Sequence, residues 1–104
     1  MKHIQEKVKI FCNQNKLNAS VESRALDIMS EVGELSKEIL LSSDYGNKKI
    51  ELNDKIRLEL GDVLFSFVAM ANSFDVDLYK CLNQVLEKYQ ERINKGLFLW
   101  SIND

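Results

Sequence analysis

Proline is absent from this 104-residue chain, and glycine occurs only four times. The strongest helix breaker is therefore missing, which favours long uninterrupted helices. The chain also has only one histidine, His3, and two cysteines, Cys12 and Cys81. This set is too small and too dispersed for a zinc site or a Cys–His catalytic pair. We expect two reduced, partly buried thiols that pack as small hydrophobic side chains.

A surplus of either charge is also missing. The 14 basic and 16 acidic residues leave a net charge of -2, so the chain lacks the basic surplus of a nucleic-acid-binding domain. No apolar run approaches the roughly 18 residues that a membrane span requires, and none follows Met1. We therefore expect no nucleic-acid partner, no membrane segment, no signal peptide and a cytoplasmic location.

The remaining composition is that of an ordinary globular protein, with 45% hydrophobic and 29% charged residues. The length allows one domain, residues 1–104, with a modest core. Small domains often increase their buried surface by oligomerising, so an oligomer is expected.

Apolar residues recur at helical spacing in four segments. This pattern predicts an all-α fold with helices over residues 2–15, 21–41, 53–73 and 78–95. The third helix has the widest apolar stripe and should be the most buried. The stripe of the fourth helix should face inward. The expected end signals are N-caps at Ser20, Asn53 and Asp77 and a C-terminal stop at Gly96.

Two similar acidic motifs lie within the second and third helices. They read Glu31-Val32-Gly33-Glu34-Leu35 and Glu59-Leu60-Gly61-Asp62-Val63. Acids three residues apart share one helix face, and at about 100° per residue both pairs border the apolar stripe. Lone pairs of this kind are usually solvated surface, but two motifs with the same pattern indicate one shared site.

Antiparallel packing of these two helices would gather four carboxylates around one small volume. Their mutual repulsion beside an apolar core calls for a counter-ion. Magnesium suits oxygen ligands of this kind and retains open positions for water or phosphate, and manganese is a possible substitute. Because a glycine within a helix costs about 1 kcal/mol, Gly33 and Gly61 indicate the close approach of another helix or a ligand.

The two motifs resemble those of the MazG-like, all-α nucleoside triphosphate pyrophosphohydrolases. The similar segments are SEVGEL over Ser30–Leu35 and LELGDVLF over Leu58–Phe65, within a resemblance that covers about residues 20–95. It implies a four-helix, MazG-like bundle completed by oligomerisation into a homodimer or homotetramer. The implied reaction converts a nucleoside triphosphate and water into the monophosphate and pyrophosphate, as in nucleotide-pool housecleaning.

The resemblance also implies roles for particular residues. The catalytic and metal-binding set would be Glu31, Glu34, Glu59 and Asp62. On the last helix, Lys88 and Arg92 would hold phosphates, although a solvated face paired with neighbouring acids is an equal alternative. Glu38 would support the site, or would be a surface acid paired with a lysine. Aromatic side chains that could carry the base, or belong to core or interface, are Tyr45, Phe65 and Trp100.

The substrate is less defined than the metal ligands. Many relatives have an additional glutamate directly before the first motif, where this chain has Ser30. A related enzyme acting on dUTP, dCTP or phosphoribosyl-ATP is therefore an alternative. A non-catalytic helical module that binds a partner through Phe98, Leu99 and Trp100 is a rival of a different class.

Overall fold

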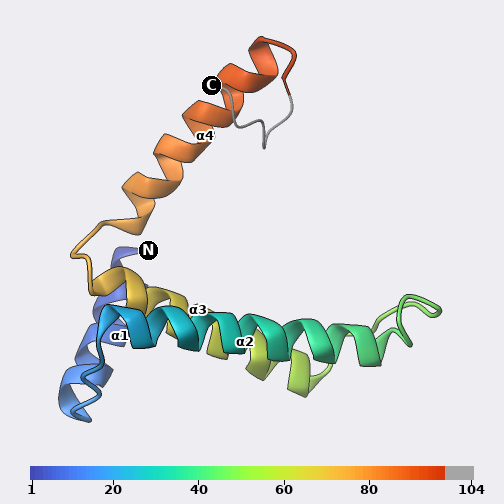
Figure 1. Ribbon diagram of the computed structural model, residues 1–104, viewed down its shortest axis with the longest axis horizontal. Coiled ribbons are helices and arrows are strands. Elements are labelled where there is room, and N and C mark those ends of the chain that lie inside the picture. The colour runs from blue at the N-terminus through green and yellow to red at the C-terminus, as the bar shows by residue number, and fades with distance from the viewer. Residues whose placement is uncertain (98–104) are drawn as a thin grey trace.

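The fold consists of four helices in a computed structural model that describes residues 1–97 (Figure 1). The helices are α1 (Lys2–Gln14), α2 (Val21–Ser42), α3 (Asp54–Asn72) and α4 (Leu78–Asn94). Each helix end lies within one residue of its expected position, and the all-α class is confirmed. No helix in the described part is long and apolar enough to cross a membrane.

The predicted helix ends are confirmed by hydrogen bonds. The Ser20 hydroxyl accepts from the Ser23 amide at 3.1 Å, and the Asn53 side chain accepts from the Ile56 amide at 2.8 Å. The Asp77 carboxylate likewise accepts from the first amides of α4. These contacts satisfy N–H groups that have no partner within the helix. Gly96 ends α4 with φ of 73°, a left-handed conformation that glycine adopts without strain.

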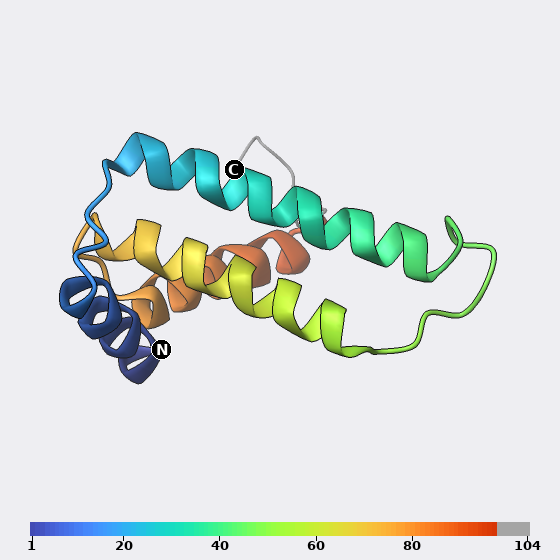
Figure 2. The same cartoon turned by 90° about the horizontal axis from the view of Figure 1, so that it is seen from below.

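Helices α2 and α3 run antiparallel and side by side, joined by a loop over residues 43–53 (Figure 2). At the other end of this hairpin α1 packs on α3, where the Phe11 and Phe65 rings meet edge to face at 5.9 Å. The buried apolar residues of the described part are Cys12, Ile56, Val68, Ala69 and Ala71. All but Cys12 belong to α3, which confirms the prediction that this helix is the most buried. Both cysteines are free thiols, as expected.

The elbow between α3 and α4 is held by a glutamine of α1. The Gln5 side-chain amide donates to Asn72 Oδ1 at 3.1 Å and to the Val76 carbonyl at 2.8 Å. Its side-chain oxygen accepts from the Leu78 amide at 3.0 Å. The Asn72 side chain in turn donates to the Gln5 carbonyl at 3.0 Å. These bonds fix the direction in which α4 leaves the hairpin.

Beyond this elbow α4 runs apart from α2 and α3 (Figure 1). On its apolar stripe Leu82, Leu86 and Ile93 are 49%, 53% and 55% exposed. The expectation that this stripe faces the core of its own chain is therefore wrong, because the elbow points it elsewhere. The radius of gyration, 16.8 Å, also exceeds the roughly 13 Å of a compact domain of this length. The predicted binding tail, Phe98 to Trp100, lies outside the described residues.

Candidate metal centre

Three carboxylates from the two halves of the hairpin converge on one point. Glu31 of α2 and Glu59 and Asp62 of α3 each offer an oxygen, and these three oxygens all lie within 4.8 Å of one another. Glu31 and Glu59 are half-buried, and Asp62 is exposed. The spacing along α3 places its two acids on one face, and the antiparallel packing brings that face to α2. The structure thus unites both sequence motifs in one site.

Glu34 is the predicted ligand that the structure does not bring into this group. It lies one turn beyond Glu31 on α2, and its side chain is exposed. A carboxylate that reaches water avoids the repulsion of the other three. Its charge still acts on the site, because it is among the causes that raise the pKa of Glu31.

Within this group, Glu31 has a shifted pKa. Partial burial raises the pKa of the Glu31 carboxyl above its ordinary value, since it disfavours the charged form. The neighbouring charges of Asp62 and Glu59 raise this pKa further, followed by those of Glu34 and Asp27. The site is therefore a concentration of negative charge without a compensating cation among these groups.

The donor set fits a small hard cation. Neighbouring oxygens around an octahedral magnesium ion are about 3 Å apart and opposite ones about 4 Å apart, because each bond is about 2.1 Å long. The observed limit of 4.8 Å among the three oxygens is close to that range. Oxygen-only ligands without a cysteine or histidine favour Mg²⁺ over zinc. A divalent cation would also remove the repulsion that raises the Glu31 pKa.

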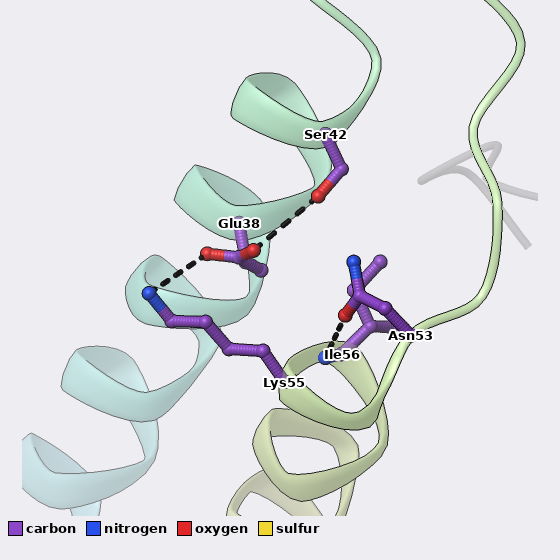
Figure 3. A network of polar contacts seen from close by, with 5 residues as sticks. All are labelled: Glu38, Ser42, Asn53, Lys55 and Ile56. Atoms are coloured by element: carbon purple, nitrogen blue, oxygen red, sulfur yellow. Dashed lines mark hydrogen bonds and ion pairs between the residues drawn. The ribbon is translucent and has the colours of Figure 1, made fainter.

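Glu38 lies on the same edge of α2, but its carboxylate is engaged by other side chains (Figure 3). One oxygen is 3.2 Å from the Lys55 ammonium of α3, and the other accepts from the Ser42 hydroxyl at 3.3 Å. Pairing with a lysine was one of the two expectations for Glu38. Sequence reasoning missed Lys55 itself, although its position four residues before Glu59 places it on the acidic face of α3.

Lys88 and Arg92, the predicted phosphate ligands, lie on α4 and not beside the three carboxylates of their own chain (Figure 1). Their cationic groups lie 5.7 Å and 5.9 Å from the centre of the Tyr89 ring. Arg92 is only 9% exposed and has further contacts. Their role in binding substrate stays a prediction.

The three aromatic residues that could carry the base, or belong to core or interface, differ in their positions. Phe65 packs against Phe11 at the junction of α1 and α3, which agrees with a core position. Tyr45 lies in the loop after α2 and is 68% exposed. Trp100 is outside the described residues.

The two motif glycines face open space. A Cβ atom built at Gly33 or Gly61 would meet nothing within 4 Å. The expected close approach of another helix is therefore wrong within the described part of this chain. A ligand or a second copy of the chain remains as a reason for these glycines.

The fold and the site define an all-α protein with an antiparallel helical hairpin that carries a group of three carboxylates near its centre. A family model for the MazG nucleotide pyrophosphohydrolase domain matches residues 19–97, and the chain belongs to this family. The family identifies the chain as a hydrolase of the nucleotide pyrophosphohydrolase type. The chain is also 35% identical over 96 residues to the uncharacterized protein YpjD of Bacillus subtilis (strain 168), covering 88% of this chain and 85% of that protein. No solved structure matches the chain.

Proposed function

We propose that this protein is a Mg²⁺-dependent nucleoside triphosphate pyrophosphohydrolase that removes unwanted NTPs or dNTPs from the nucleotide pool. The observation that carries the proposal is the convergence of Glu31, Glu59 and Asp62 within 4.8 Å. Glu34 lies one turn from Glu31 on the same face of α2, and in this proposal it joins them as a fourth carboxylate. Family membership supports the class of reaction, and the three converging carboxylates support the location of the site.

In this proposal Glu31, Glu59 and Asp62 hold Mg²⁺, with Glu34 as a fourth carboxylate. The ion would neutralise phosphate oxygens and lower the pKa of an attacking water. A carboxylate that is not occupied as a ligand accepts the proton of this water. The water oxygen bonds to the α-phosphorus, and the bond from that phosphorus to the bridging oxygen breaks. The electron pair leaves with pyrophosphate, and the nucleoside monophosphate remains.

A nucleotide panel with Mg²⁺ tests the reaction directly. We expect one monophosphate and one pyrophosphate per turnover. Turnover in ¹⁸O-labelled water should place the label in the monophosphate, because attack occurs at the α-phosphorus. Label in pyrophosphate, or release of inorganic phosphate with a diphosphate, would contradict the assignment. Preference for dUTP, dCTP or phosphoribosyl-ATP within the panel would define a specialised member, and hydrolysis of none would favour a non-catalytic module.

Matched amide substitutions test the site. Glu34→Gln and Asp62→Asn should each abolish turnover while the helical circular dichroism spectrum stays unchanged. Glu22→Gln removes the same charge from an exposed position in the first turn of α2 and should retain activity. Wild-type rates in both site variants would remove the assignment of these residues.

We further infer that a second copy of the chain covers the exposed apolar surfaces. The chain exposes 8338 Å², whereas a compact 12.0 kDa monomer exposes about 6000 Å². The excess is comparable to the area that obligate homodimers bury. Besides the α4 stripe, exposed apolar side chains of the hairpin include Val32, Leu60, Leu64 and Phe67, which are 41–49% exposed. A homodimer, or a homotetramer built from it, would cover both surfaces.

Sedimentation velocity tests this assembly. Leu86→Glu places a charge on the α4 stripe and should shift the protein toward monomer. Gln84→Glu adds the same side chain on the opposite side of α4 and should leave the assembly intact. A wild-type protein that sediments as a monomer at micromolar concentration would refute the proposed assembly.

A further inference from the structure

The ammonium group of Lys55 is held between the three-carboxylate group and the loop, one to two helical turns from the carboxylates. Lys55 precedes Glu59 by four residues, so it lies on the same face of α3, about 6 Å along the helix axis. Glu38 follows Glu31 by seven residues on α2, a distance of about 10 Å along that axis. The Lys55–Glu38 pair, 3.2 Å long, bridges the two helices at this point (Figure 3).

The two members of this pair differ strongly in exposure. The Glu38 side chain is 13% exposed and is held by both Lys55 and Ser42, whereas the Lys55 side chain is 69% exposed. A largely covered carboxylate therefore fixes an ammonium group that still faces water. Because an ammonium has three N–H donors, Lys55 can bind an anion without leaving Glu38.

Stability alone is a poor reason for this arrangement. Ion pairs with an exposed partner contribute little to folding, and well-packed apolar side chains often stabilise an interior position better than a carboxylate. Lys55 also lies in the first turn of α3, where the helix dipole disfavours a positive charge. The covered Glu38 carboxylate and the positive charge at the start of α3 are both explained if the Lys55 ammonium binds a ligand.

The charges at this end of the hairpin favour an anion. The first turn of α3 directs backbone N–H groups toward the loop. An open hollow of about 440 Å³ there is lined by two lysines, Lys48 and Lys49, and one acid, Glu51, together with Ser42, Leu52 and Asn53. Asp54 is also present there, but it is paired with Arg57 at 3.1 Å. Arg24 is a cation on the acidic face of α2, but it lies at the opposite end of the hairpin. There its guanidinium donates to the Leu17 carbonyl at 2.6 Å.

We propose that Lys55 is a substrate-binding residue that contacts the outer phosphates of the triphosphate, with Glu38 and Ser42 as its positioning residues. The inference rests on the proposed function, since it assumes that the α-phosphate lies at the three carboxylates. The triphosphate then extends along the hairpin toward the loop, and Lys55 holds the part that leaves as pyrophosphate. The substrate class is thereby a nucleotide with at least a pyrophosphate group beyond the scissile bond.

Binding of the product inorganic pyrophosphate in the presence of Mg²⁺ tests this orientation without turnover. By calorimetry, Lys55→Gln should weaken this binding about tenfold, the loss expected for one charge-assisted hydrogen bond. Lys55→Arg should recover part of the affinity, and Glu38→Gln should weaken it less than Lys55→Gln. Lys37→Gln removes the same charge beside Glu38 from an exposed position, and it should change binding by less than about twofold.

The kinetics should show the same division. Lys55→Gln should raise KM and weaken inhibition by pyrophosphate, with inhibition by the nucleoside monophosphate unchanged. Equal effects of Lys55→Gln and Lys37→Gln, or wild-type protein that binds no pyrophosphate, would overturn the proposal. A variant that unfolds at lower temperature but binds pyrophosphate normally would make the pair a structural clamp. Failure of the proposed function would show differently, as wild-type protein that hydrolyses no nucleotide.

Discussion

Gln5 offers a quantitative test of the elbow that directs α4. Gln5→Ala removes the hydrogen bonds to Asn72, Val76 and Leu78. Each such bond contributes about 0.5–1.5 kcal/mol net, and water can replace part of the partly exposed set. We therefore expect the free energy of unfolding to fall by about 2 kcal/mol. For a domain of this size that corresponds to a melting temperature lower by about 10 °C.

Two assays should detect the change, namely urea unfolding followed by circular dichroism and amide hydrogen exchange. The Leu78 amide donates to the Gln5 side chain, so its exchange should accelerate in Gln5→Ala. The Cys81 amide donates to the Asp77 carbonyl within α4 and should exchange as before.

Gln14→Ala is the matched control, because Gln14 is exposed at the far end of the same helix. The reasoning would be refuted if the two alanine variants unfolded at the same urea concentration. Unchanged exchange at Leu78 would refute it independently. A loose elbow should also weaken any assembly that α4 mediates, which sedimentation of Gln5→Ala would show.

Three further predictions concern the site and the core. In the metal-free protein the pKa of Glu31 is raised, so as pH rises the unfolded chain loses the Glu31 carboxyl proton at a lower pH than the folded protein does. The free energy of unfolding should therefore fall as pH rises from the ordinary carboxyl pKa through the raised one. In thermal melts at different pH, Glu31→Gln should reduce that fall, and an unchanged pH profile would argue against the raised pKa. Mg²⁺ should raise the melting temperature of the wild-type protein but not of Glu31→Gln. Gly61→Ala should raise stability by about 1 kcal/mol, since its Cβ meets nothing within 4 Å; a loss of stability or activity would indicate that a ligand or second copy covers this face. Val68→Ala should lose about 2 kcal/mol in urea unfolding, because Val68 is fully buried; an unchanged midpoint would contradict its place in the core.

Local patterns were sufficient to predict the helices. Helical spacing defined the four segments, and Ser20, Asn53 and Asp77 marked the starts of three of them through contacts two or three residues away. The direction of α4 could not be predicted in this way. It depends on Gln5, whose partners lie 67 to 73 residues along the chain, and an amide side chain carries no signal of such a contact.

The candidate site, too, could be predicted from local patterns only in part. The repeated motif predicted the meeting of Glu31, Glu59 and Asp62, because helix geometry and antiparallel packing suffice to bring them together. The outward position of Glu34 depends on hydration and repulsion among like charges, which the spacing does not express. Lys55 was missed because its role follows from a contact with Glu38 across the hairpin.

The distance between the three carboxylates and the loop has an evolutionary consequence. The carboxylates lie in the middle of α2 and α3, whereas residues 43–53 form the exposed connection at the hairpin's end. Exposed connections tolerate insertions and deletions far better than packed helices do. Descendants of this chain could therefore lengthen, shorten or exchange the connection while the three-carboxylate group in the packed helices is inherited unchanged.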